Sequence, residues 1–328
     1  MQLSLFARRR IVTAAAAFCV LLYPLVARAN HGPGASGGGS ATLSGETLKP
    51  GSFEFDLRED YTQFEHFGRN EAISRAIEGG GGFDALDHGF LTTVEGAVGV
   101  FEDFQLGASI GYFVGRDFIS ADRADDGSFD VSTAQPSGLT DLVLTGKYRV
   151  LKGQPGNLSI VGGVIFPTGR NDVALANGES LSPTDQPGTG RWGFPIGLAY
   201  SRFLTSHLTF DASVLYTSRL QRADFRVGNR FDVGLAFAYR LTGSIKHFPQ
   251  FSIFGEVNSV YLYRDRSDAQ GYDPNSGGET IYLTPGGRVR FGPHTALTLA
   301  PSFPIYQHLY GNQGKVDFKL AFTFSVSL

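Results

Sequence analysis

The 328-residue chain is poor in cysteine: it has one, Cys19, and also one methionine and one tryptophan. Cys19 lies in an N-terminal segment that we expect to be removed, so the mature chain has no cysteine. This excludes disulfides and a thiolate nucleophile. A secreted protein of this size without disulfides must be stabilised by its sheet or by its surroundings.

Long hydrophobic runs are also missing beyond residue 29. No apolar stretch after that point approaches the roughly 20 residues that a transmembrane helix needs. If the protein spans a membrane, it does so with strands.

Basic residues are outnumbered by acidic ones. The chain has 28 Lys+Arg against 31 Asp+Glu, and without the four arginines of residues 1–29 it has 24 against 31 and a net charge of −7. Nucleic-acid-binding proteins normally carry a basic stripe. We therefore expect no nucleic-acid partner.

Residues 1–29 have the pattern of a secretory signal peptide. Arg8, Arg9 and Arg10 precede the apolar run IVTAAAAFCVLLYPLVA, which closes on the small-x-small sequence Ala27-Arg28-Ala29. Cleavage is expected before Asn30. The alternative is an N-terminal membrane anchor, which is less favoured because the run is short for a spanning helix and is followed by a cleavage pattern.

Residues 30–50 are Gly/Ser-rich without periodicity and are expected to be a flexible segment. From residue 51 to 328, apolar and polar side chains alternate in segments long enough to cross about 25 Å of hydrocarbon at a tilt. The predicted strands are 52–63, 89–101, 104–115, 139–150, 157–167, 191–203, 207–218, 230–241, 250–263, 279–291, 296–307 and 315–328. Prolines inside three of them, the sixth, tenth and eleventh, predict bulges or shifted boundaries.

The connections between these strands alternate between short and long. A closed barrel with short periplasmic turns and longer external loops has this rhythm, and it also has an even number of strands. A soluble sandwich has no reason to sort its loops in this way. The sequence therefore predicts an all-β fold, a closed antiparallel transmembrane β-barrel of about 12 strands in the outer membrane of a Gram-negative bacterium.

The faces of the strands support a barrel with its apolar side toward outer-membrane lipids. The opposite faces carry many ionisable residues, which a dry core would not tolerate because each unpaired buried charge costs several kcal/mol. We take these residues as candidates for lining the lumen: Glu54, Asp56, Arg58, Asp60, Glu95, Asp141, Lys147, Arg149, Asp211, Asp232, Arg240, Glu256, Arg288, Arg290, Asp317 and Lys319.

The motifs GLTDLVLTGKYRVL, PTG (167–169) and GTGRWGFPIGLAYSRFL occur in this order within residues 138–204. They resemble the outer-membrane β-barrel transporter family named after the meta-cleavage pathway of phenol degradation, and the resemblance covers about 138–328. It implies a barrel associated with the uptake of small, often aromatic compounds. No catalytic or ligand-binding residues are carried over from it.

The final segment, FKLAFTFSVSL, is expected to close the barrel and to be recognised by the barrel assembly machinery during insertion. Outer-membrane barrels usually end on Phe or Trp, and Leu328 departs from that habit. Pro301 and Pro304 also mark a place where ladder hydrogen bonds would be missing and apolar cargo would leave sideways.

The state of the lumen stays open at this point. Inward positions on the middle strands are small, which indicates an open narrow conduit, a groove filled by the N-terminal segment or an inserted loop, or simple strand curvature. Lys147, Arg149, Arg288 and Arg290 form either a basic strip facing Glu54, Asp56 and Asp60 or a salt-bridge network that sets register.

We expect a channel or transporter for small molecules, including aromatic or hydrophobic ones, with a structural or adhesive barrel as the alternative. A lipid hydrolase is less favoured, because His207 and His294 have no nucleophile motif near them. No catalytic residue, metal or cofactor is predicted; His66, Asp84, Asp87 and His88 have no recognised metal-ligand spacing. Residues 70–78 predict a short helix in the first long loop, either a lid or an ordinary external turn.

Overall fold

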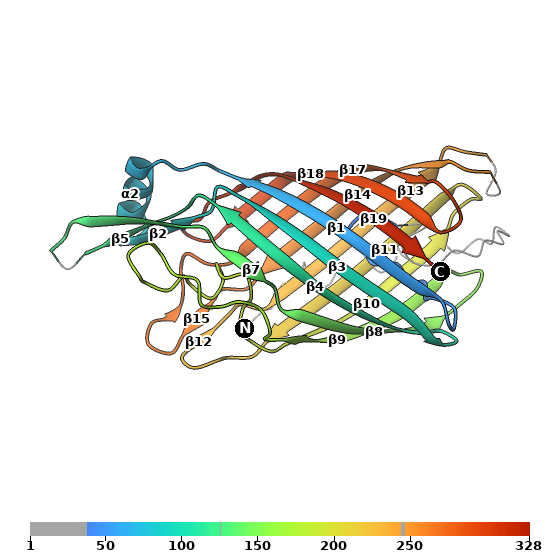
Figure 1. Ribbon diagram of the computed structural model, residues 1–328, viewed down its shortest axis with the longest axis horizontal. Helices are drawn as coiled ribbons and strands as arrows, with labels where there is room; N and C mark the ends of the chain where they lie inside the picture. The colour runs from blue at the N-terminus through green and yellow to red at the C-terminus, as the bar shows by residue number, and fades with distance from the viewer. Residues whose placement is uncertain (1–37, 125, 244–246) are drawn as a thin grey trace, which may run out of the picture.

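The protein is a closed antiparallel β-barrel (Figure 1). The computed structural model describes residues 38–124, 126–243 and 247–328, so the expected signal peptide lies outside the described residues. The barrel strands are β1 (Phe53–Phe64), β3 (His88–Phe101), β4 (Phe104–Arg116), β8 (Leu142–Leu151), β9 (Asn157–Phe166), β10 (Gly193–Phe203), β11 (Leu208–Arg219), β13 (Arg230–Arg240), β14 (Gln250–Leu262), β17 (Gly278–Arg290), β18 (Thr295–Leu309) and β19 (Val316–Ser327). Because β1 pairs with both β3 and β19, the sheet closes on itself, and the predicted fold class is confirmed.

The alternation of side chains decides which face meets lipid. On β13, Leu235 and Phe237 are 45% and 49% exposed, whereas Ala236 and Ala238 between them are buried against the interior. A water-soluble barrel or sandwich would bury the large apolar residues instead. An apolar band with a polar interior is the arrangement of an outer-membrane barrel, and it places the outer surface in contact with lipid.

The two ends of the barrel differ. The short turns lie at the end where the C-terminus is found, and the longer connections extend from the opposite, external end (Figure 1). The long connections contain β2 (Gly82–Ala85), β5 (Phe118–Arg123), β6 (Phe129–Ala134), β7 (Ser137–Leu139), β12 (Phe225–Arg226), β15 (Arg266–Ser267), β16 (Gly271–Tyr272) and the helix α2 (Arg69–Glu78). Among the described residues, no helix is long and apolar enough to cross a bilayer.

The external connections form a folded unit with a core of its own. Strands β2, β5 and β6 make a three-stranded sheet, and α2 packs on it through Ala72 and Ala76. Phe67 and Phe83 complete this cluster with an edge-to-face contact between ring centroids 4.8 Å apart. The helix is therefore part of the external sheet unit and does not enter the lumen.

Prolines interrupt the ladders where the sequence predicts bulges. Pro195 has no partner on β9, and the β17–β18 register has no pairs between Leu283↔Phe303 and Gly287↔Leu299, the interval that contains Pro285 and Pro301. A bulge between Ile281 and Tyr282 accommodates Pro304 on the facing strand. Proline removes the N–H that a ladder needs, so these strands keep their place by pairing on either side of the break.

Candidate functional site: the lumen

Residues 38–48 lie inside the barrel, and Lys49 and Pro50 form the exposed turn that leads into β1. The polar backbone groups of residues 38–48 bond to side chains from eight of the twelve strands, namely Arg58 (β1), Gln105 (β4), Lys147 (β8), Ser159 (β9), Ser201 (β10), Ser213 (β11), Glu256 (β14) and Arg288 (β17). A segment that contacts strands around most of the circumference must cross the lumen. The described part of the segment that was expected to be flexible is therefore held in place.

Glu256 is the main anchor of this segment. Its carboxylate accepts backbone hydrogen bonds from three consecutive residues, Ser40 at 2.8 Å, Ala41 at 3.1 Å and Thr42 at 2.5 Å, and a further bond from the Thr42 hydroxyl. The residue is only 1% exposed. A row of backbone N–H groups around a carboxylate is an anion-binding nest, which compensates for the burial of the charge.

Basic side chains hold the carbonyl side of the same segment. Lys147 Nζ donates to the Ser44 carbonyl at 3.1 Å, and Arg58 Nη1 donates to the Ser40 carbonyl at 2.6 Å. Arg288 Nη2 is 3.3 Å from the Gly39 carbonyl oxygen. Opposite charges on the wall thus bind the N–H and C=O groups of a segment whose own ionisable residues are Glu46 and Lys49.

Glycine is required where the segment touches the wall. A Cβ on Gly45 would lie 2.3 Å from the carbonyl oxygen of Asn157, and one on Gly39 would lie 2.3 Å from the carboxylate carbon of Glu256. The backbone of Gly45 is fixed on both sides. Its N–H donates to Ser201 Oγ at 2.7 Å, and its carbonyl accepts from Ser159 Oγ at 2.7 Å. The Gly/Ser composition therefore fits close packing in the lumen.

A cavity of about 400 Å³ lies against the segment, with residues 38–44 forming one side of it. Its walls differ in chemistry. The apolar wall is built by inward-facing residues of β3 and of β8 to β11: Ala97, Val143, Val161, Ile165, Pro195 and Leu215. The charged wall carries Glu54, Asp56, Glu95, Lys147 and Arg288. The cavity is thus amphipathic, and its volume is in the range of small-molecule sites.

The predicted lumen residues fall into four groups. Five of them, Glu54, Asp56, Glu95, Lys147 and Arg288, line the cavity, and Arg58, Asp211 and Glu256 lie beside the segment. Asp60 accepts a two-point bond from Arg58, and Asp232 one from Arg230. Lys319 Nζ lies 4.5 Å from the ring centroid of Tyr282.

The remaining candidates lie at the ends of strands. At the periplasmic end, Arg149 pairs with Asp103, Arg240 donates to the Ser206 carbonyl, and Arg290 donates to the Pro293 carbonyl. Toward the external end, Asp141 accepts from the backbone N–H groups of Gly169 and Thr189, and Asp317 is exposed near the start of β19. These residues do not join the cavity.

The proposed basic strip is therefore divided. Lys147 and Arg288 face the cavity with Glu54 and Asp56, whereas Arg149 and Arg290 bind turns. The strands β8 and β17 that carry them are not neighbours in the sheet. Lys147 and Arg288 therefore lie near Glu54 and Asp56 from two separate parts of the wall. They do not form a continuous basic strip.

Uncharged residues of the site escaped the sequence analysis. Gln105, Ser159, Ser201 and Ser213 bind the segment, and the apolar wall forms the other half of the cavity. Strand alternation shows that these positions face inward. No local signal distinguishes them from other inward positions, because their role depends on where the segment lies.

The histidines considered for hydrolysis lie at periplasmic turns. His207 Nδ1 is 2.9 Å from Ser206 Oγ, and His294 Nδ1 is 2.6 Å from the Ser327 carbonyl oxygen. In the ranges that the structure describes, neither histidine has a carboxylate partner to orient it. A catalytic base normally has such a partner, so this geometry does not favour a hydrolase.

Comparison with known proteins agrees with this architecture. The model of a family described as "Putative MetA-pathway of phenol degradation" matches residues 32–303, and no curated protein matches. Among solved structures, the COG4313 outer membrane channel from Pseudomonas putida F1 superposes with a TM-score of 0.56 at 15% identity, covering 86% of this chain and 97% of that one.

Two further solved barrels are more distant. The CymD monoaromatic hydrocarbon channel gives a TM-score of 0.42 at 10% identity, with 86% of this chain and 89% of that chain covered. The NanC porin gives 0.43 at 11% identity, with 82% and 98% covered. The fold and the match over most of the chain lead to one conclusion. This chain is an outer-membrane β-barrel of a Gram-negative bacterium and belongs to the family described as the putative MetA pathway of phenol degradation.

Proposed function

We propose that this protein is an outer-membrane channel for small molecules that combine an apolar part with a polar group, aromatic compounds among them. The observation that carries the proposal is the amphipathic cavity beside the N-terminal segment. An apolar wall removes the ring of such a solute from water, and charged groups opposite receive its polar substituent. The family description names phenol degradation, and phenol has an apolar ring and a polar hydroxyl group.

The N-terminal segment is the gate in this proposal. It crosses the lumen, but it is attached to the barrel wall by hydrogen bonds and contributes no strand. Displacement of the segment would leave the sheet closed and the lumen wider. Planar bilayers containing the protein without residues 30–50 should therefore show larger conductance steps than the complete mature chain shows.

The choice of solute is tested by current block. Phenol added to one chamber should interrupt the current in a concentration-dependent way, whereas ribose, a polar molecule of comparable size, should not. Leu215→Asn makes the apolar wall polar and should shorten the blocks several-fold; Leu204→Asn, in a periplasmic turn, should leave them unchanged. Equal block by phenol and ribose would contradict the proposed solute class.

A structural barrel without transport is the second candidate, and the filled lumen favours it. The two functions predict different ion conductance for the protein that lacks the segment. If the protein lacking residues 30–50 folds and inserts but conducts no ions, the barrel is filled by its own side chains and the channel proposal fails.

A further inference from the structure

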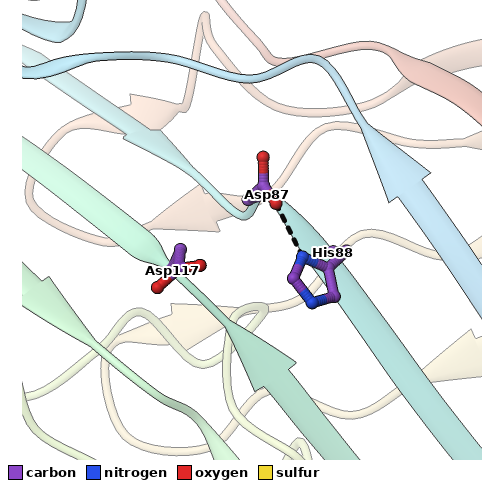
Figure 2. A group of neighbouring side chains, drawn as sticks. All are labelled: Asp87, His88 and Asp117. Carbon is purple, nitrogen blue, oxygen red and sulfur yellow. Dashed lines mark hydrogen bonds and ion pairs between the residues drawn. The ribbon is translucent and has the colours of Figure 1, made fainter.

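The β3–β4 hairpin leaves the barrel at a bend formed by two short connections. Asp87 lies between β2 and β3, His88 is the first residue of β3, and Asp117 lies between β4 and β5. Figure 2 shows the three side chains gathered around this bend, with Asp117 on the neighbouring strand connection. One potential ligand atom from each residue lies within 4.8 Å of the others.

We propose that Asp87, His88 and Asp117 form a binding site for a divalent transition-metal ion of the zinc type. Zinc binds imidazole nitrogen and carboxylate oxygen at about 2.0–2.2 Å, so atoms within 4.8 Å of one another can reach one ion by small side-chain rotations. An imidazole ligand favours zinc over calcium or magnesium, which prefer oxygen ligands alone. Three protein ligands leave further positions of the ion to water.

Asp87 organises the two histidines of the region. Its Oδ2 lies 2.6 Å from His88 Nδ1, and its Oδ1 lies 2.7 Å from Nδ1 of His66. When an ion binds, Asp87 and His88 Nδ1 would exchange this hydrogen bond for bonds to the metal, and the proton of the neutral imidazole would lie on the other ring nitrogen. His66 has a side chain that is 74% exposed and can rotate toward the ion.

The surroundings leave Asp117 available. Its neighbour Arg116 is turned toward Gln135, with Nη1 2.5 Å from Oε1. Asp117 is exposed, adopts a φ of 53°, and forms no ion pair with any residue in the described part of the chain. A carboxylate beside Asp87 without a protein cation between them is a place where a bound cation relieves repulsion.

The site would act at the junction of barrel and external sheet. Strands β3 and β4 belong to the barrel, and β2 and β5 belong to the external sheet, so Asp87 and Asp117 mark the two crossings between them. An ion bound to both would tie the crossings together. This is independent of the proposed solute pathway, because His88 packs on the outward rings of Tyr61 and Phe90.

The test is zinc binding by the folded mature protein in detergent, purified without a histidine tag and treated with a chelator. Competition with a chromophoric zinc chelator should show one equivalent bound per chain. Asp117→Asn and His88→Gln should each weaken this binding by at least roughly tenfold, since ligand and supporting groups commonly have effects of that size. Both substitutions keep side-chain size, and the β-barrel circular dichroism spectrum checks folding.

His308→Gln is the matched control, because His308 is an exposed external histidine outside the cluster; it should bind zinc as the unchanged protein does. Absence of zinc binding at millimolar concentration would overturn the proposal. So would binding that is unaffected by Asp117→Asn, since the ion would then lie elsewhere.

Discussion

Single side chains decide whether the lumen is occupied. Glu256 binds three backbone N–H groups and one hydroxyl of a segment more than 200 residues away in sequence. Hydrogen bonds to a charged group each contribute roughly 1.5–3 kcal/mol, more than neutral ones do. The docking of the segment should therefore depend strongly on this carboxylate.

Glu256→Gln should release the segment. The amide has one acceptor oxygen, and its NH2 group would face the N–H donors of Ser40 and Ala41. A loss on the order of 3 kcal/mol in docking would raise the open fraction by about 100-fold. Single-channel recording should show a higher open probability than that of the unchanged protein.

Glu95→Gln is the matched control, because Glu95 also faces the cavity but forms no hydrogen bond with the described residues of the segment. It should change ion selectivity more than open probability. An equal rise in open probability for both variants would mean that the charge of the lumen controls opening, and that the hydrogen bonds between Glu256 and the segment do not.

At the scale of elements, the strands β17 to β19 are joined less completely than the others. The β18–β19 register ends at Ser302↔Lys319, although both strands extend further toward the external end. Beyond that point the side chain of Gln307 donates to the Val316 carbonyl at 2.8 Å and accepts from Val316 N–H at 3.0 Å. One amide side chain thus bridges a part of the wall where backbone pairing is missing.

We call the incompletely paired part of β18, from Pro301 to Leu309, the seam. The proposed sideways exit of apolar cargo can be tested there. Replacing Pro301 and Pro304 together with alanine supplies two N–H groups and should tighten the seam, while Gln307→Ala should loosen it. Uptake of a hydrophobic dye, measured relative to a polar dye of equal size, should fall in the first variant and rise in the second.

Pro293→Ala, in a periplasmic turn, serves as the control and should change neither uptake. If the ratio of hydrophobic-dye uptake to polar-dye uptake is the same in all variants, cargo does not leave through this seam. The role of β19 as the recognition element for the assembly machinery stays a prediction, although its pairing with both β18 and β1 makes it the closing strand.

At the scale of the whole molecule, the external connections form a unit whose acids lie close together. Burial raises the pKa of Asp185 to about 7, and the negative charges of Asp84 and Asp265 add to this effect. An acid with a raised folded-state pKa binds more protons when folded than when unfolded. Stability of this unit should therefore fall as the pH rises from about 4 to about 7.

Hydrogen exchange of the 167–192 loop, corrected for intrinsic rates, should show less protection at pH 8 than at pH 5. Asp185→Asn should remove most of this difference, because the amide does not titrate. Asp172→Asn changes an exposed acid that is paired with Arg170 in the same loop, and it should keep the pH dependence. A pH dependence that survives Asp185→Asn would assign it to another group.

The barrel wall follows from local sequence. Outward Leu235 and Phe237 alternate with inward Ala236 and Ala238, and a period of two in a strand reports its faces without any knowledge of the rest of the chain. Strand limits were also close: 230–241 was predicted, and β13 spans Arg230–Arg240. The strand predicted at 139–150 is interrupted: Leu139 ends β7, which pairs with β4, Asp141 binds the loop backbone, and β8 begins at Leu142.

The contents of the barrel were decided by tertiary structure. Nothing near Glu256 in sequence shows that its partners are Ser40 to Thr42, and nothing near Asp87 shows that Asp117 lies beside it. Alternation specifies the direction of a side chain relative to its own strand. Which distant groups meet it depends on closure of the sheet and on the course of a segment with no periodicity, and both are properties of the folded chain as a whole.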